Sequence, residues 1–397
     1  MIRNICTAIT FLSIFLACPS LSLSAGSAPV YIGFDAEEGH RTSTSDDAIR
    51  IGILTAMDEI NRAGGVLGGR KLELIVKDNR SVPARGIKNI EEFSEIEDLV
   101  AVVGGKFSPV QIEEVDILHE TRTILLDAWG AADEITDNGH APNYCFRVSL
   151  KDSWAIKTMM DHSRKIGAKS LGVLLPVTGW GRSNEKAIHE YLAHNPDMKV
   201  TSTQWYNWGT QSMTEEYNAL LDSGAKAVIL VANEAEGSIL VKEIAALDRD
   251  RRLPIISHWG VSGGAFTRMT GDSLGKLDFS VVQTYSFFDG HRPDKLKTFY
   301  KTAGRLFGIK GPEDIPSPVG VAHAYDAVHM LALAIDKAGT TDRPSVRDAL
   351  ENITEYDGLI KFYRRPFTKE NHSALLPEDL FMGRFRLSDG AILRVKD

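Results

Sequence analysis

The sequence predicts an α/β fold made of two similar lobes, each a parallel-rich sheet with helices on both faces. Strand and helix patterns alternate along the chain with few long irregular stretches, which is typical of parallel sheets with crossover helices. The alternation occurs twice, once in each half of the chain. About 370 residues follow an apolar leader, more than one hydrophobic core normally serves. We therefore expect two lobes of the same kind.

The elements follow from hydrophobic spacing. Ile53, Met57 and Ile60 recur at helical intervals, whereas short apolar runs bounded by turn residues are typical of buried strands. In the first half we expect strands at 30–34, 71–77, 99–103 and 123–126, and helices at 47–63, 83–95 and 108–120. After an apolar segment at 144–148, we expect strands at 170–175, 200–205, 227–231 and 255–257, and helices at 152–166, 183–194, 213–223 and 235–248.

The last third of the chain continues the alternation. A strand at 279–285 and helices at 294–307 and 319–337 are interpreted as completing the first lobe. The final strands, 381–387 and 392–395, flank an Asp389-Gly390 turn and form a hairpin.

Residues 1–25 have the pattern of a secretory signal peptide. Arg3 precedes an apolar run at 5–16, and small residues near Ala25 suit cleavage. A lipoprotein site at Cys18 is the alternative, and the bulky Leu16 disfavours it. No later window offers the roughly 18 apolar residues that a membrane helix needs. We expect an exported, periplasmic and soluble chain without a lipid anchor.

The cysteine content and the net charge exclude an internal disulfide and argue against some classes of partner. Cys6 and Cys18 lie in the leader, which leaves Cys145 without an internal disulfide partner and suited to a small buried position. The net charge of -8 argues against nucleic acid as a partner.

The segment 58–81, DEINRAGGVLGGRKLELIVKDNRS, is the most distinctive stretch of the chain. It reads as a helix end, a glycine-rich turn with Gly64 and Gly65 suited to a left-handed cap, and a strand that delivers polar residues at its tip. This segment closely resembles the early βα unit of the periplasmic substrate-binding proteins of ABC transporters, of the branched-chain amino-acid-binding (leucine, isoleucine, valine) type.

The resemblance implies a two-lobed type I periplasmic-binding-protein fold, a clamshell with three hinge crossings near Ser149, Ser257 and Phe381. It assigns residues 26–148 and 258–380 to lobe I, and residues 149–257 and 381–397 to lobe II. Ligands of open α/β sheets bind at the carboxyl ends of the strands. Four such ends carry the candidate site residues.

Two of these strand ends belong to lobe I. In Gly104-Gly105-Lys106-Phe107-Ser108-Pro109, the resemblance places the ligand carboxylate on Ser108, next to Phe107; a plain helix cap is the alternative role for the serine. In the loop after Asp127, the residues at ligand-contacting positions are Trp129, Gly130 and Ala131. Ala131 stands where relatives have a hydroxyl, so only a backbone contact can survive there.

The other two strand ends belong to lobe II. Trp180 matches an aromatic that covers the ligand in relatives, and its flanking glycines favour an exposed ring on a loop rather than a core role. Glu234 follows the next strand, and His258 and Trp259 follow the last. Relatives hold a glutamate near Trp259 that pairs with the ligand ammonium, and this chain lacks it. Either Glu234, Glu236 or Asp127 replaces that acid, or the ligand is not an α-amino acid.

The sequence matches catalytic and metal-binding motifs poorly. The segment 271–277 has phosphate-loop character but is one residue short and lacks the terminal hydroxyl. We therefore expect no enzyme activity, catalytic residue, cofactor or metal. The expected function is an ABC-importer receptor that captures a small amino-acid-like or aromatic or branched carboxylic solute as a monomer and delivers it to a membrane permease. The alternative is a sensing protein that signals to a separate membrane partner.

Overall fold

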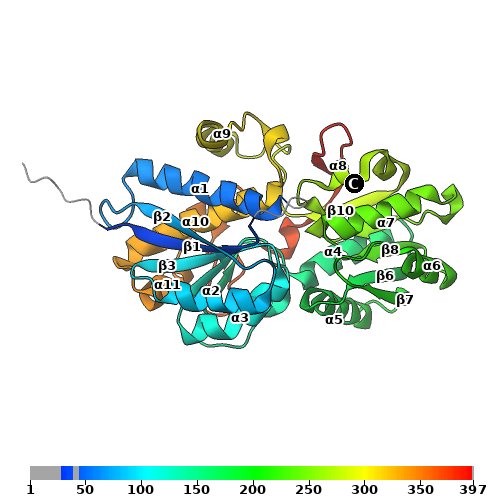
Figure 1. The fold of residues 1–397 in the computed structure, drawn as a ribbon, viewed down its shortest axis with the longest axis horizontal. Coiled ribbons are helices and arrows are strands. Elements are labelled where there is room, and N and C mark those ends of the chain that lie inside the picture. The colour runs from blue at the N-terminus through cyan, green and yellow to red at the C-terminus, as the bar shows by residue number, and fades with distance from the viewer. Residues whose placement is uncertain (1–27, 39–43, 396–397) are drawn as a thin grey trace, which may run out of the picture.

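The computed structural model describes residues 28–38 and 44–395, which form two lobes side by side (Figure 1). Each lobe is built on one sheet, five-stranded in the first and seven-stranded in the second. The signal-peptide prediction and Cys18 lie outside the described residues.

The first sheet has the order β2-β1-β3-β4-β5, and all of its strands are parallel. Apolar residues on its two faces belong to two separate cores, one under α1, α10 and α11 and the other under α2 and α3. The elements are β1 (Val30–Ala36), β2 (Leu72–Asp78), β3 (Leu99–Gly104), β4 (Ile124–Asp127), β5 (Cys145–Arg147), α1 (Ser45–Ala63), α2 (Pro83–Ser94), α3 (Ser108–Glu120), α10 (Pro318–Ala338) and α11 (Arg343–Glu351). Gly64 and Gly65 end α1 with positive φ, as predicted.

The second sheet has the order β14-β13-β10-β9-β8-β6-β7, parallel except for the C-terminal hairpin. Its strands are β6 (Ser170–Pro176), β7 (Lys199–Tyr206), β8 (Ala227–Leu230), β9 (Ile255–Ser257), β10 (Phe279–Gln283), β13 (Phe381–Phe385) and β14 (Ile392–Arg394). The helices of this lobe are α4 (Asp152–Lys165), α5 (Gly179–Ala193), α6 (Thr214–Asp222), α7 (Glu234–Ala246) and α8 (Phe266–Thr270).

The assignment of strand 279–285 to the first lobe is wrong. β10 pairs in parallel with β9, with Phe279 opposite Ile255, and antiparallel with β13 on its other side. The chain therefore leaves the second lobe after Gln283 rather than near Ser257. The apolar pattern of β10 shows that the strand is buried, but it does not specify which neighbours complete its hydrogen bonds.

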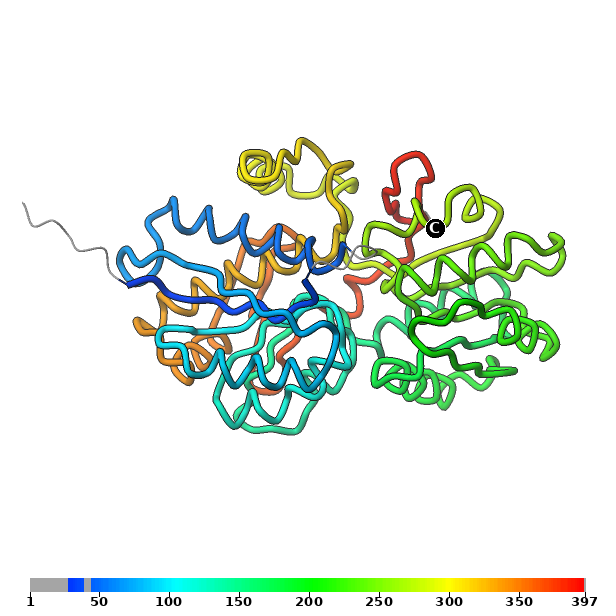
Figure 2. The backbone as a smooth tube through the Cα atoms, viewed as in Figure 1, coloured from blue at the N-terminus to red at the C-terminus, as the bar shows by residue number. Residues whose placement is uncertain are grey.

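The segments that follow β10 return to the first lobe and then leave it again (Figure 2). The helix α9 (Pro293–Phe307) packs on α1, and a small sheet of β11 (Glu355–Asp357) and β12 (Phe362–Arg364) follows α11. Ser373 bridges to Arg147 beside β5 before the chain passes to β13. The backbone thus crosses between the lobes after β5, after β10 and before β13.

Within the part of the chain that the structure describes, one helix, α10, is long and apolar enough to span a membrane by length and composition, although the sequence analysis found no such window. Within its most apolar window 83% is buried inside the protein. It packs between α1 and α11, so it is accounted for as the central helix of the first lobe.

Candidate functional site

The carboxyl ends of strands from both sheets meet at the boundary between the lobes and enclose a cavity. In this structure the cavity has about 10 Å³ of accessible space, roughly that of one water molecule. Residues from the loops after β3 and β4 form one wall, and residues from the loops after β6, β7, β8 and β9 form the other. The lining consists of Lys106, Phe107, Ser108, Pro109, Trp129, Ala131, Trp180, Trp208, Asn233, Trp259 and Gly260.

The structure brings most of the candidate site residues to this cavity and leaves three behind its walls. The residues in the lining are Phe107, Ser108, Trp129, Ala131, Trp180 and Trp259. Gly130, Glu234 and His258 lie outside the lining. A Cβ at Gly130 would lie 2.8 Å from the Gln111 side chain, so this glycine is needed for close packing beneath the loop.

Ser108 begins α3 but does not cap it, because the N-cap residue is Phe107. Its Oγ accepts hydrogen bonds from the backbone amides of Ala131, at 2.9 Å, and Ala132, at 3.3 Å. The plain helix-cap role is therefore wrong. With both lone pairs of the oxygen accepting amide protons, Ser108 can meet a ligand only as a donor. A carboxylate at the start of α3 suits both this hydroxyl and the helix dipole.

Four tryptophans dominate the lining. The rings of Trp129 and Trp259, both nearly fully buried, lie 5.8 Å apart between centroids. Trp208 makes a T-shaped contact with Phe107, with 5.3 Å between the ring centroids, and is the aromatic that the sequence analysis missed. Trp208 follows the end of β7, as the other site residues follow their strands, and that position was the available signal. Such a cavity favours a ligand with a ring or a sizeable apolar body.

Trp180 lies in the first turn of α5, which begins at Gly179, earlier than predicted. The Thr178 Oγ1 caps the helix by accepting from the Gly181 amide at 3.2 Å. A Cβ at Gly181 would lie 2.0 Å from the Pro176 carbonyl oxygen, so this glycine permits tight packing rather than loop freedom. The ring of Trp180 is buried, and the expectation of an exposed ring on a loop is wrong.

A buried carboxylate, Asp152, holds two aromatic side chains of the second wall. Its Oδ1 accepts from Trp180 Nε1 at 3.1 Å and lies 3.0 Å from His258 Nε2. The His258 Nδ1 accepts from the backbone amide of Trp259 at 2.9 Å, so the proton resides on Nε2. His258 thus positions Trp180 and Trp259 instead of lining the cavity.

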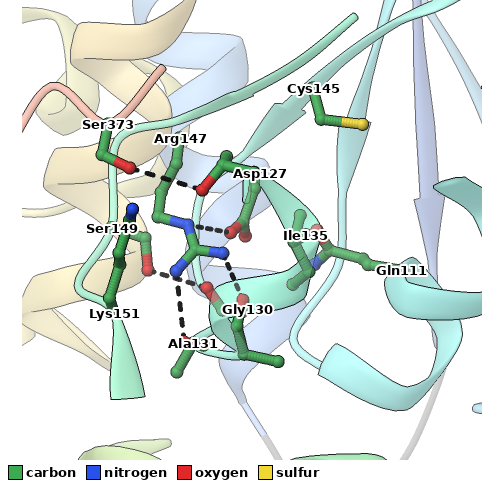
Figure 3. A network of polar contacts seen from close by, with 12 residues as sticks. Gln111, Asp127, Gly130, Ala131, Ile135, Cys145, Arg147, Ser149, Lys151 and Ser373 are labelled. Carbon is green, nitrogen blue, oxygen red and sulfur yellow. Dashed lines mark hydrogen bonds and ion pairs between the residues drawn. The ribbon is translucent and has the colours of Figure 1, made fainter. Parts of the chain in front are cut away.

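Asp127 pairs with Arg147 inside the first lobe (Figure 3). It is not among the residues that line the cavity. The Arg147 guanidinium lies 3.2 Å from its Oδ2, and its own Oδ1 accepts from the Trp129 amide at 3.0 Å. Burial raises the pKa of Asp127 to about 6, against the opposing effect of Arg147. Arg147 also donates to the carbonyls of Ala131, Ala132 and Leu150. Together the pair fixes the loop that carries Trp129 and Ala131.

The cavity edge contains an ion pair between the lobes that the sequence analysis missed. The Lys106 ammonium, from the loop after β3, contacts the Glu234 carboxylate at the start of α7, and both side chains are buried. The ammonium lies 5.6 Å from the centroid of the Phe107 ring and 5.9 Å from that of Trp129. The signal for Lys106 was its place between a glycine-rich strand end and the predicted carboxylate site.

Behind Trp259, His323 of α10 connects the second crossing to the first lobe. Its ring lies 5.5 Å from Trp259, and its nitrogens meet Thr284 Oγ1 at 2.9 Å and the Ala128 carbonyl oxygen at 3.1 Å. Burial lowers its pKa to about 3, so the ring is neutral at physiological pH.

No group of three or more metal-ligating side chains occurs within residues 28–38 and 44–395.

Comparison with known proteins identifies the family. The family model described as periplasmic binding protein matches residues 29–391. The chain belongs to the periplasmic binding protein family. It is 23% identical over 309 residues to the leucine-, isoleucine-, valine-, threonine- and alanine-binding protein of Pseudomonas aeruginosa, covering 78% of each chain.

Solved structures share the fold of this binding protein. A type 1 periplasmic binding protein from Bordetella pertussis aligns with a TM-score of 0.82 at 20% identity, over 93% of this chain and all of that one. An ABC transporter solute-binding protein from R. palustris, in complex with 4-hydroxybenzoate, aligns with a TM-score of 0.74 at 14% identity, over 94% and 96% of the two chains. The predicted family resemblance and two-lobed α/β fold are confirmed, and the relatives are binding proteins, not enzymes.

Proposed function

We propose that this binding protein is the periplasmic receptor of an ABC importer, closing its lobes on a small carboxylic solute and delivering it as a monomer to a membrane permease. The observation that carries the proposal is the interlobe cavity, where Ser108 at the start of α3 lies beside four tryptophans. The Pseudomonas relative, a branched-chain amino-acid-binding protein by name, and the R. palustris protein with its bound aromatic acid support a solute of this size.

The cavity provides separate places for a carboxylate and an apolar body. The Ser108 hydroxyl donates to an anion, and the positive end of the α3 dipole stabilises it without a full counter-charge. The tryptophans come from both lobes, with Trp129 in the first and Trp180, Trp208 and Trp259 in the second. A ligand held between them stabilises the closed arrangement because it contacts both walls at once.

We expect ligand binding to compact the molecule. Moving an open-closed equilibrium from 1:99 to 99:1 requires about 5.5 kcal/mol of differential binding, which buried rings and charge-assisted hydrogen bonds can supply. A thermal-shift screen of aromatic acids, short carboxylates, amides and amino acids identifies the ligand class, since ligand at ~100 times its Kd adds roughly 2.7 kcal/mol. Small-angle scattering then compares the free and saturated protein. An open free form that keeps its radius of gyration at saturation contradicts closure.

Ser108→Ala should weaken carboxylate binding by roughly 1 to 2 kcal/mol, the size of a lost charge-assisted hydrogen bond. Calorimetric titration measures the change. Ser149→Ala is the matched control. The buried Ser149 hydroxyl donates to the Gly130 carbonyl at 3.2 Å, so it supports the loop whose Ala131 amide bonds to Ser108, but Ser149 does not line the cavity. Both variants should lose some stability, and only Ser108→Ala should lose affinity. Equal affinity in the two variants would show that the ligand carboxylate does not bind to Ser108.

A further inference from the structure

The Lys106–Glu234 ion pair forms a cation site that the protein fills with its own side chain. The ammonium of Lys106 is buried, in contact with a carboxylate and flanked by the rings of Phe107 and Trp129. A carboxylate beside aromatic faces is the environment that stabilises a buried alkylammonium. Glu234 also accepts from the Ser45 hydroxyl of α1, at 3.3 Å, which fixes its orientation.

The order of the two charges determines what a ligand meets. Lys106 is part of the cavity lining, whereas Glu234 lies behind it. A ligand group that enters this end of the cavity therefore contacts the ammonium first. A second ammonium placed there would compete with Lys106 for Glu234 and would be repelled by it. A carboxylate placed there gains a charge-assisted contact.

The other two acids considered for a ligand ammonium, Asp127 and Glu236, are engaged within the protein, and so is the buried Asp152. Asp127 pairs with Arg147, and the Glu236 Oε1 accepts from the Gly209 amide at 3.0 Å. Asp152 holds Trp180 and His258. Releasing Asp127 or Asp152 would leave buried partners without an acceptor, which is costly. None of the three lies in the cavity lining.

We propose that Lys106 occupies the amine subsite of this cavity and is the residue that selects carboxylates lacking an α-ammonium group over amino acids. The inference rests on the proposed function and adds the chemical class of the solute. The ligand carboxylate lies between the start of α3 and the Lys106 ammonium, and Glu234 keeps that ammonium in place. The ring or branched body of the solute fills the space among the tryptophans.

The test uses three matched probe pairs: phenylacetate with phenylglycine, 3-phenylpropanoate with phenylalanine, and 4-methylpentanoate with leucine. Each pair differs only by the ammonium group. Calorimetry on the full mature protein should show that carboxylates bind more tightly than their amino acids. Lys106→Met keeps an unbranched apolar stem of similar length and removes the ammonium group with its charge. It should weaken carboxylate binding roughly ten- to a hundredfold and strengthen amino-acid binding roughly tenfold, because a ligand ammonium would then approach the Glu234 carboxylate without repulsion from the Lys106 charge.

Two further variants separate specificity from stability. Lys77→Met is the matched control, since Lys77 pairs with Glu92 and lies 5.5 Å from the Phe93 ring, outside the cavity lining; it should leave both affinities unchanged. Glu234→Gln keeps the Lys106 charge, so it should preserve the preference for carboxylates. Thermal unfolding without ligand confirms that each variant is folded.

The outcomes are distinct. A wild-type preference for amino acids, or equal losses for both probe classes in Lys106→Met, would overturn the role of Lys106 and leave the proposed receptor function standing. Binding of neither class to the wild-type protein, with no response to other carboxylates in the screen, would overturn the proposed function and this inference with it. Reversal of the preference in Lys106→Met alone establishes Lys106 as the selecting residue.

Discussion

Arg147→Met should lower the free energy of unfolding by about 3 to 5 kcal/mol, the cost of leaving a buried charge without its partner. Arg147 and Asp127 have fully buried side chains, and the guanidinium also donates to three backbone carbonyls. Removing it leaves the buried Asp127 carboxylate without its cationic partner and takes one donor away from each of these carbonyls. Because two of these carbonyls, those of Ala131 and Ala132, belong to the loop that carries Trp129, ligand affinity should fall together with stability.

Denaturant unfolding of the variant measures the loss. Arg386→Met is the contrasting control, because Arg386 makes three hydrogen bonds to Asp389 but is exposed. An exposed ion pair of this kind contributes little to stability. The double variant Arg147→Met with Asp127→Leu should recover part of the stability, since it removes both charges instead of one. A loss for Arg147→Met no larger than that of Arg386→Met would contradict a structural role for the buried pair.

Local patterns predicted most elements because the signals that determine them are close in sequence. The helix α3 begins at Ser108 and ends at Glu120 as predicted, since Pro109 suits a first turn and the apolar spacing continues to the end. The start of α5 was misplaced because glycines usually indicate a loop. At Gly181, the reason for glycine is instead the Pro176 carbonyl against which it packs.

Long-range partners could not be read from the sequence in the same way. Strand β10 has the apolar character of any buried strand, and only its pairing with β9 and β13 assigns it to the second sheet. Asp127 was a reasonable candidate for a ligand acid at a strand end, but its partner Arg147 comes from another strand of the sheet. The Lys106–Glu234 pair likewise joins residues 128 positions apart. Such pairings are set by the tertiary fold.

The largest pH effect should come from a buried carboxyl pair in the first lobe. Asp35 of β1 accepts from the side-chain amides of Asn79 and Asn89, each at 2.6 Å. Glu114 of α3 is hydrogen-bonded to Asp35. Burial, followed by repulsion from Asp35, raises the pKa of Glu114 well above its ordinary value of 4.5. Glu114 therefore holds the proton and donates it to Asp35, whose own pKa is raised mainly by burial.

Because the pKa of Glu114 is higher in the folded than in the unfolded chain, its contribution to stability is complete below glutamate's ordinary pKa and declines as the pH rises to the folded value. The decline is about 1.4 kcal/mol per pH unit within that window, and it levels off above it. Glu114→Gln keeps an N–H donor for Asp35 and cannot lose a proton. The variant should therefore gain stability relative to the wild type as the pH increases from 5 to 9, measured by denaturant unfolding. Glu113→Gln, on the same helix but exposed, is the control and should follow the wild type at every pH. A constant difference between Glu114→Gln and the wild type across this range would show that Glu114 does not titrate with folding.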